Sequence, residues 1–359
     1  MILSVRDGCA WSIAAATSMG VRLQPLGART VSAGGLYSLQ ATSAETNVLS
    51  VPASLGLPAL ALTCFVEGSP IAAFIKGDLR RRGIAYRGPE LPQGGPWGLR
   101  HQFNIADSGF GVRGPVVHND RAGEVGLRLR VEDFDLKTLF EQEGVAMLHI
   151  SGLIAALSPS TGAFCLSLAS AAKAAGTMVS FDINYRASFW KGREAELRDV
   201  FTKIATLSDI LCGNEEDFQL ALGVEGPESG GRDLATRVSG FREMILRLRG
   251  LCPRAVVFAT TLRQVLSASS HLWGSILFAD GDFSIIEPRE IDVLDRIGGG
   301  DGFVGGLLYG LLNGRDLQTC NSLAWACGAM AVTVDTDYAR PESEMQLYNI
   351  YKGNARVVR

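Results

Sequence analysis

The sequence has few of the residues that build metal sites. Its 359 residues include four histidines, and none has a second histidine or a cysteine at the spacing of metal ligands. The seven cysteines contain no C-x-x-C pair. We therefore expect no structural zinc site. Because the cysteine number is odd and most cysteines sit in apolar runs, we expect reduced thiols in a cytoplasmic protein.

Long apolar runs and a strong net charge are missing as well. No stretch of about 20 uninterrupted apolar residues occurs, so the sequence predicts no membrane span. The formal net charge is only −3, which gives no electrostatic reason to expect a nucleic acid or an anionic membrane as partner. The pattern G-x-x-x-x-G-K-[ST] does not occur, which excludes a P-loop. With 47% hydrophobic and 20% charged residues, the chain has an ordinary globular composition.

From residue 145 onward, short apolar runs alternate with segments that carry apolar residues at helical spacing. The expected strands lie in VAMLHISG, TMVSFDINYR, SDILCGNEEDF, RAVVFATTLR and GSILFADG. Strands that alternate with helices indicate βαβ units, and hence an α/β protein whose mainly parallel sheet is covered on both faces.

The first third of the chain has a different pattern. Residues of about 20–45 and 99–130 are rich in glycine and show period-two alternation, which favours antiparallel ribbons. Between them, residues 69–84 predict a helix. Since no proline- or serine-rich linker separates these parts, we expect residues 1–359 to form a single domain, with the ribbons inserted in the α/β body.

The stretch DRIGGGDGFVGGLLYGLL, residues 295–312, predicts a phosphate site. Gly298, Gly299 and Gly300 lack a Cβ, so their backbone N–H groups can approach a ligand closely. The apolar residues that follow predict a helix, whose positive N-terminal end points at this turn. Asp301, in its first turn, is suited to accept the proton of a hydroxyl that attacks a γ-phosphoryl group. The alternative is that the glycines only form the turn and Asp301 only caps the helix.

A second alternative is a dinucleotide site, because Gly300, Gly302 and Gly305 satisfy the pattern G-x-G-x-x-G. This pattern is weak alone. It belongs at the start of a βαβ half that continues well beyond it, and we expect no such half here.

These motifs resemble those of the PfkB family of carbohydrate kinases. DRIGGGDGFVGG is similar to the family's D-T-x-G-A-G-D signature, and FDINYRASFW, GNEEDF, ATTLR and ILFADG most resemble 2-keto-3-deoxygluconate kinases. The resemblance covers most of the chain after Asp107. It implies a ribokinase-like three-layer α/β/α sandwich with a small β-sheet lid. It also implies an enzyme that transfers the γ-phosphoryl group of ATP to a sugar acid with the help of Mg²⁺.

On the phosphate side, the resemblance implies roles for several residues. Asp301 would be the general base, and Gly298, Gly299 and Gly300 would form the anion hole. Asn214, Glu216 and Asp217 in GNEED would organise magnesium and phosphate through water, with Asp217 where the family usually has Glu. Their alternative is a solvated acidic helix start. The implied nucleotide contacts are Thr260, Thr261, Leu262, Arg263, Ala326 and Gly328, for which the alternatives are a strand-end turn and a core helix.

On the sugar side, Asp182, Asn184 and Arg186 occupy alternate positions at an expected strand end, so their side chains could share one face. By resemblance, Arg186 and Arg121 would meet the carboxylate of a sugar acid, for which an arginine fork is suited. A surface salt bridge is the alternative for either arginine. Asn47 and Asn104 would complete the sugar site.

The sugar side also departs from the family. Thr17 and Ser18 stand where Gly-Glu is expected, TSAETN replaces G-G-A-E-x-N, and Asn104 replaces a tyrosine. Two other functions therefore stay open: a non-catalytic sensor of a sugar acid or nucleotide, and a kinase of a neutral sugar. A homodimer through the lid is a further expectation from the resemblance.

Overall fold

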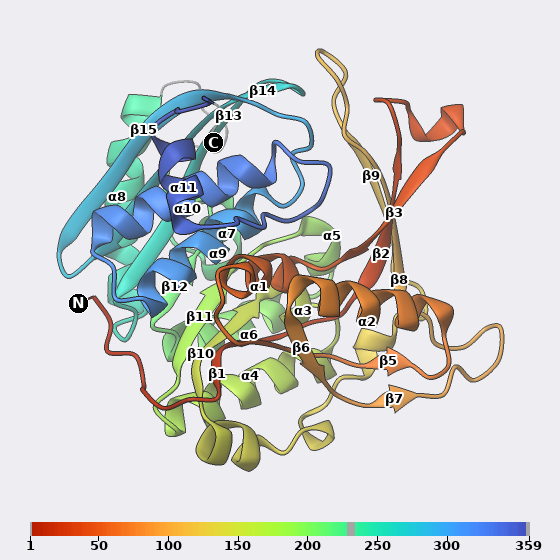
Figure 1. The fold of residues 1–359 in the computed structure, drawn as a ribbon. Helices are drawn as coiled ribbons and strands as arrows, with labels where there is room; N and C mark the ends of the chain where they lie inside the picture. Colours follow the sequence, from red (N-terminus) through yellow and green to blue (C-terminus); the bar gives the residue numbers. More distant parts are fainter. Residues whose placement is uncertain (1, 228–233, 357–359) are drawn as a thin grey trace.

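The computed structural model describes residues 2–227 and 234–356, and its centre is a nine-stranded sheet (Figure 1). The strand order is β15-β14-β13-β12-β11-β10-β1-β4-β6. Of these nine strands, only β14 runs opposite to the others. The strands are β1 (Trp11–Ala16), β4 (Ala59–Leu62), β6 (Ile84–Arg87), β10 (Val145–Ser151), β11 (Met178–Asp182), β12 (Ile210–Cys212), β13 (Val257–Ser267), β14 (Ser270–Ala279) and β15 (Asp282–Asp292). The expected α/β class with a mainly parallel sheet is confirmed.

Helices cover both faces of this sheet and enclose two apolar cores. Ile13 and Ala15 of β1 point into one core, whereas Ala14 and Ala16 point into the other. The first core lies under α1 (Ala44–Ser54), α2 (Pro70–Arg82), α9 (Gly299–Leu312), α10 (Leu317–Ala331) and α11 (Glu344–Tyr351). The second lies under α3 (Gly152–Ala155), α4 (Pro159–Ala174), α6 (Glu194–Leu207), α7 (Glu215–Leu222) and α8 (Leu234–Leu251). This arrangement is the expected three-layer sandwich.

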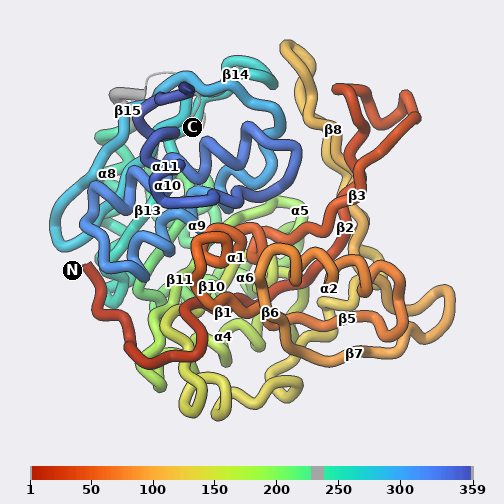
Figure 2. Tube along the Cα trace, viewed as in Figure 1, coloured from red at the N-terminus to blue at the C-terminus, as the bar shows by residue number. Residues whose placement is uncertain are grey.

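A separate four-stranded sheet projects from the body, and we call it the small sheet (Figures 1 and 2). Its order is β3 (Tyr37–Thr42), β2 (Gly20–Pro25), β8 (Gln102–Asp107) and β9 (Val116–Asp120). β2 and β8 pair in parallel, while the outer pairs are antiparallel. The shorter elements are β5 (Phe65–Val66), β7 (Glu90–Leu91), α5 (Ala187–Trp190), 3₁₀ turns at Val31–Ala33, Val125–Arg128 and Val131–Asp133, and a π turn at Thr138–Glu143.

The first third of the chain contributes more to the large sheet than its pattern suggests. The sequence predicts ribbons and one helix there, and α2 agrees with that helix. The structure adds β1, β4, β6 and α1 to the α/β body. β1 and β4 consist largely of alanine and leucine and are almost entirely buried, so they lack the polar alternation that marks a half-exposed strand.

Helix α9 packs unusually close to its neighbours because it is rich in glycine. A Cβ on Gly305 would lie 2.7 Å from the carbonyl oxygen of Val48 in α1, and one on Gly306 would lie 2.6 Å from that of Leu323 in α10. Neither position tolerates a side chain without movement of a backbone. The two glycines therefore fix the middle of α9 against α1 and α10. In the described part of the chain, no helix has the length and apolar character needed to cross a membrane.

Candidate active site

The glycine turn lies at the carboxyl end of β15, which runs in the same direction as β13 because both are antiparallel to β14. Glycine stands at each of the three positions for a different structural reason. Gly298 has a left-handed φ of 84°, and an added Cβ would lie 1.8 Å from the carbonyl oxygen of Asp337. Gly299 is packed against Val332. Gly300 is exposed and has open space where a Cβ would be, so it is the position at which a ligand could come close.

Asp301 follows in the first turn of α9 and receives a hydrogen bond from Asn47 of α1, with 2.8 Å between Nδ2 and Oδ2. The N–H groups of the first helical turn have no acceptor within the helix, so they face the same region as this carboxyl group. Burial raises the pKa of Asp301 to about 7, against the lowering effect of the Asn47 hydrogen bond, and Glu45 adds to the rise. A carboxyl group with this pKa exchanges protons near neutral pH.

Two more acidic side chains with a raised pKa lie close to Asp301 in space. Burial raises the pKa of Asp182, as do the neighbouring carboxylates of Asp217 and Asp301. Burial also raises the pKa of Glu45, whose carboxylate accepts a hydrogen bond from Thr17 at 2.7 Å. Neighbouring carboxyl groups of raised pKa are typical of sites that handle protons.

The residues of DINYR converge, although not as strand alternation predicts. β11 ends at Asp182, and Asn184 has a left-handed φ of 42°. The chain therefore turns after the strand, and the prediction of alternate positions on one strand end is wrong. Asn184 Nδ2 still lies 3.4 Å from Asp182 Oδ2, and the charge of Arg186 lowers the pKa of Asp182. Arg186 itself is exposed and donates to the carbonyl of Tyr185 at 2.7 Å.

Arg263, Arg296 and Arg186 lie close enough together for their charges to affect one another. Desolvation and the charges of Arg296 and Arg186 together lower the pKa of Arg263 to about 10. Burial, Arg263 and Arg296 lower the pKa of His271 to about 4. Neighbouring cations repel one another, and a bound polyanion such as a triphosphate would offset that repulsion.

The residues predicted to organise magnesium stand at the start of α7. Asn214 and Asp217 form a reciprocal cap, in which each side chain accepts the other residue's backbone N–H at 2.8 to 2.9 Å. The second oxygen of Asp217 accepts from the backbone N–H of Tyr185 at 2.8 Å, and burial raises the pKa of Asp217 to about 6. Glu216 is exposed.

This donor set fits a magnesium ion held through water. Both carboxylate oxygens of Asp217 already accept a backbone N–H, but each keeps a lone pair for a water molecule. Mg²⁺ prefers hard oxygen ligands and retains several of its waters. Within residues 2–227 and 234–356, no group of three or more His, Cys, Asp or Glu side chains is arranged to enclose a metal ion directly.

The predicted nucleotide contacts fall into two groups. Thr260–Arg263 lie within β13 rather than after it, because β13 continues as one arm of the hairpin with β14. Thr261 is partly exposed and Arg263 exposed, whereas Leu262 is fully buried in the apolar core. Thr260 is also buried, and its hydroxyl oxygen meets no hydrogen-bond partner in the described part of the chain.

Helix α10 shows the same division. Ala326 is a core residue with no exposure, so its side chain cannot reach a nucleotide. Gly328 lies beside the glycine turn, where an added Cβ would come within 3.0 Å of the carbonyl oxygen of Gly299. Leu262 and Ala326 were predicted as contacts from motif position alone, and burial explains why their side chains do not face the cleft.

At the expected sugar end, hydroxyl groups stand where the resemblance leads us to expect glycine. Thr17 donates to Glu45, and its hydroxyl also lies 2.9 Å from that of Ser43, which caps α1. The cavity between Ser43, Glu45 and Arg121 has a volume of only about 20 Å³, which is room for about one water molecule. Two oxygens nearby, on Gln102 and Asn104, are buried without a hydrogen-bond donor among the described residues. Acceptors of this kind fit a ligand that carries hydroxyl groups.

Arg121 is not free to meet a carboxylate as the sequence predicts. Its Nη1 donates to both oxygens of Glu124, at 2.9 and 3.0 Å, and Glu124 is fully buried. Ser18 also donates to Glu124. The salt bridge named as the alternative for Arg121 is therefore present, and Arg121 itself lines the small cavity beside Glu45.

Sequence reasoning missed several side chains around the glycine turn. Arg296 belongs to the quoted motif, and a cation directly before a phosphate turn is a signal that could have identified it. Asp295 opens the same motif and accepts the N–H of Ile297 at 3.0 Å. Arg22 and Asp337, which meet in the structure, are 315 residues apart, and no local pattern links them.

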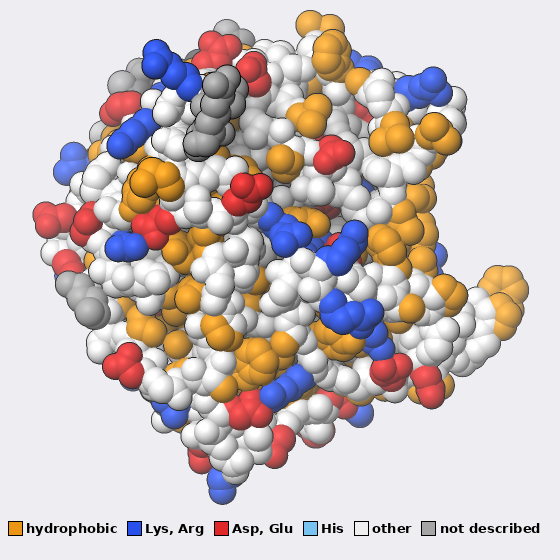
Figure 3. All heavy atoms as spheres, in the orientation of Figure 1, with side chains coloured by type: hydrophobic (Ala, Val, Ile, Leu, Met, Phe, Trp, Pro, Cys, Tyr) orange, Lys and Arg blue, Asp and Glu red, His pale blue; other side chains and the backbone are white. Residues whose placement is uncertain are grey.

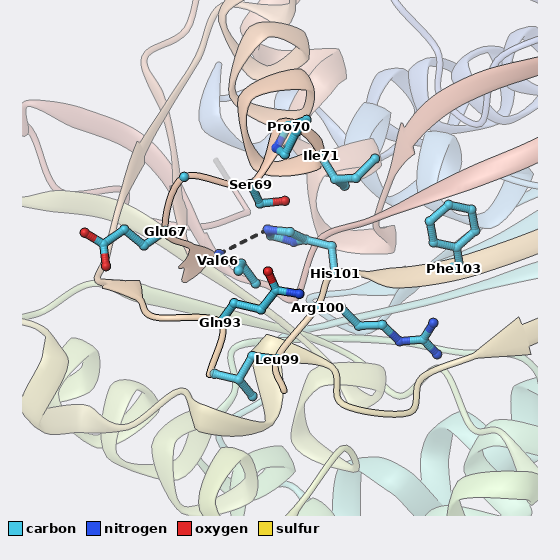
Figure 4. A pocket seen from close by; sticks show the side chains of 11 residues that line it. Val66, Glu67, Ser69, Pro70, Ile71, Gln93, Leu99, Arg100, His101 and Phe103 are labelled. Carbon is cyan, nitrogen blue, oxygen red and sulfur yellow. Dashed lines mark hydrogen bonds between the residues drawn. The ribbon is translucent and has the colours of Figure 1, made fainter. Parts of the chain in front are cut away.

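A separate hollow of about 310 Å³ lies at the base of the small sheet, between the start of α2 and β8 (Figure 4). His101 stands in its wall, and its Nε2 accepts the backbone N–H of Val66 at 3.3 Å. None of the residues lining this hollow belongs to the predicted site.

Together, the fold and the site define a carbohydrate kinase. The profile of the pfkB family carbohydrate kinases matches residues 132–342, and the chain belongs to this family. A solved structure of 2-dehydro-3-deoxygluconokinase from Thermotoga maritima superimposes with a TM-score of 0.85 and 25% identity, over 96% of this chain and 98% of that one. The ribokinase-like fold is thereby confirmed.

Two curated relatives show how far the similarity extends along the sequence. A 2-dehydro-3-deoxygalactonokinase of Haloferax volcanii is 25% identical over 323 residues, which cover 89% of this chain and 90% of the relative. A 5-dehydro-2-deoxygluconokinase of Clostridium perfringens is 27% identical over 212 residues. That match covers 59% of this chain and only 56% of the relative's length.

Proposed function

We propose that the protein is an ATP-dependent kinase that phosphorylates a hydroxyl group of a small sugar acid, with 2-keto-3-deoxygluconate as the first candidate. The observation that carries this proposal is the position of Asp301, a carboxyl group of pKa about 7 held by Asn47 directly after a glycine turn at a helix N-terminus. The similarity to kinases named for three different keto-deoxy sugar acids supports the choice of acceptor.

In this proposal, each end of the cleft has its own task. Asp301 accepts the proton of the acceptor hydroxyl, while the backbone N–H groups of residues 299–301 hold the negative charge on the phosphoryl group. Arg263 and Arg296 hold the nucleotide phosphates. Bound MgATP supplies the transferable phosphoryl group and a metal ion that neutralises its charge.

The acceptor would lie between Asp301 and the sugar end of the cleft. Arg186 is the exposed cation there and would meet the acceptor's carboxylate, while Gln102 and Asn104 would meet its hydroxyl groups. Since the cavity beside Glu45 is almost filled, binding requires the small sheet to move outward and then close over the acceptor, which excludes water from the reaction.

The test is ADP formation from MgATP across a panel of sugar acids and their uncharged analogues. We expect 2-keto-3-deoxygluconate or a close relative to give the highest kcat/KM, and its uncharged analogue to lose at least about tenfold because Arg186 is left without an anion. Turnover with the uncharged analogue alone would establish a neutral-sugar kinase.

A sensor without catalysis is the second candidate, and the filled sugar end favours it. Thr17 and Ser43 stand where the family has glycine, and their side chains fill space beside Glu45. The same panel distinguishes the two: a sensor would show a raised melting temperature with a sugar acid but no ADP with any of them.

We also propose that a homodimer forms through the outer face of the small sheet. Hydrophobic side chains gather along this part of the molecule (Figure 3). Leu39, Val116 and Phe110 are among its exposed apolar residues, at 39%, 59% and 67%. Exposed apolar strand faces favour association. Light scattering should give twice the monomer mass, and Leu39→Glu should reduce it to one monomer.

The cytoplasmic location expected from the cysteines stays a prediction.

A further inference from the structure

Arg22 is one of the largest fully buried side chains of the protein, and it comes from the small sheet rather than from a core. It lies on β2, with its side chain 2% exposed. Its two terminal nitrogens donate to two different carboxylates, Asp295 and Asp337, each 1% exposed. A buried guanidinium that joins two buried acids is costly unless its geometry is satisfied, so its position is strictly defined.

Both acids are attached to the glycine turn. Asp295 begins the turn, and its Oδ1 accepts the N–H of Ile297 at 3.0 Å. The carbonyl oxygen of Asp337 lies against Gly298, so closely that a Cβ there would be 1.8 Å away. Arg22 is therefore linked to the glycine turn through Asp295 on one side and Asp337 on the other. The N–H groups of this turn face the proposed phosphoryl site.

Other side chains of the small sheet converge on the same acids. Ser108 donates to Asp295 at 2.9 Å, and Gln24 donates to it at 3.2 Å. Thr42 of β3 donates to Asp337 at 2.7 Å. Arg22, Gln24 and Asn104 face the same side of the small sheet, because residues 22 and 104 are paired in register and residue 24 is two positions along. The small sheet thus meets the body at the turn itself.

We infer that Arg22 is a positioning residue that ties the place of the small sheet to the shape of the anion-binding turn. Outward movement of the small sheet would pull Arg22 away from Asp295 and Asp337, and would leave two buried carboxylates facing each other beside the turn. The turn therefore takes its phosphate-binding shape only when the small sheet is closed. This role rests on the proposed function and adds a link between acceptor enclosure and phosphoryl binding.

Hydrogen exchange of the ligand-free protein tests the link without any turnover. In Arg22→Lys, one ammonium cannot span two acids, so we expect amide exchange to rise at least tenfold in β2 and in residues 295–302 together, with β11 unchanged. The matched control is Arg113→Lys. Arg113 lies in the β8–β9 connection and pairs with Asp107 of the small sheet at 2.7 Å. It should leave residues 295–302 at the wild-type rate.

Kinetics then separate a positioning role from loss of structure. We expect Arg22→Lys to lower kcat at least tenfold, with the MgATP dissociation constant and the acceptor KM within threefold of wild type. Should Arg22→Lys not fold, Asp337→Asn serves instead, since it keeps the pair between Arg22 and Asp295. Wild-type exchange in residues 295–302 in the folded variant would overturn the inference. If exchange rises but no sugar acid is phosphorylated by the wild type, the link stands and the proposed function fails.

Discussion

The two ends of the proposed active site are built in different ways. The centre of the proposed phosphate end is the local glycine turn, residues 295–301, with the backbone N–H groups at the start of one helix. The sugar end depends on side chains from separate segments, among them Glu45, Gln102, Arg121 and Asp182. A site made of backbone is specified by a short local motif. A site made of distant side chains can change its ligand through a few substitutions while the chemistry beside it stays the same.

The largest expected effect is at Asp301, where the two ends meet. Asp301→Asn removes the proton acceptor, so kcat should fall by about 10²-fold or more while MgATP binding is retained. Initial rates and calorimetric titration with MgATP would measure both. The matched control is Asp316→Asn, an exposed acid that caps the start of α10. A kcat in Asp301→Asn within threefold of wild type would show that Asp301 is not the base.

The next effect tests how strictly the phosphate end depends on its backbone. Gly298→Ala combines a left-handed φ with a Cβ 1.8 Å from the Asp337 carbonyl, so it should destabilise the protein by roughly 2 to 5 kcal/mol and abolish most turnover. Gly176→Ala is the control: its φ is 76°, but nothing lies within 4 Å of the added atom. It should cost only about 1 kcal/mol. Equal losses in chemical denaturation would contradict the close contact.

The pH dependence gives a smaller, graded effect. Because burial raises the pKa of Asp301 to about 7, the group is protonated below that pH and cannot accept a proton. We expect kcat/KM to rise about tenfold per pH unit toward pH 7 and to level off above it. A profile that is flat between pH 5 and 8, with MgATP binding constant, would mean that Asp301 is already ionised or is not needed.

The smallest effect concerns the sugar end. Glu124→Gln removes the charge that now holds Arg121, so KM for a sugar acid should fall about threefold, while an uncharged analogue is unaffected. The control is Asp133→Asn, which breaks the ion pair between Asp133 and Arg130, also three residues apart. It should change the KM of neither ligand. An unchanged KM for both ligands in Glu124→Gln would place Arg121 outside the acceptor site.

The sequence allowed the elements of the α/β body to be predicted better than the surroundings of single side chains. Strand and helix patterns after residue 145 correctly located the elements that carry Asp182, Asn214 and Asp301. The motif alone could not show that Leu262 and Ala326 face the core, because burial depends on packing across the sheet.

Long-range contacts were beyond local patterns altogether. The pairing of Arg22 with Asp337 and the Asn47 contact to Asp301 join residues 315 and 254 positions apart. Arg121 shows a further limit: its partner Glu124 is only three residues away, but the sequence does not reveal whether that acid or a ligand receives the guanidinium.

Phosphorus NMR of the reaction mixture tests phosphoryl transfer to a sugar-acid hydroxyl most directly. With MgATP and 2-keto-3-deoxygluconate, we predict a new phosphomonoester signal that appears as ADP forms. Coupling to two methylene protons should split it into a triplet, as expected for phosphate on a primary hydroxyl. Release of inorganic phosphate alone, or spectra in which ATP stays intact with every sugar acid tested, would contradict the account.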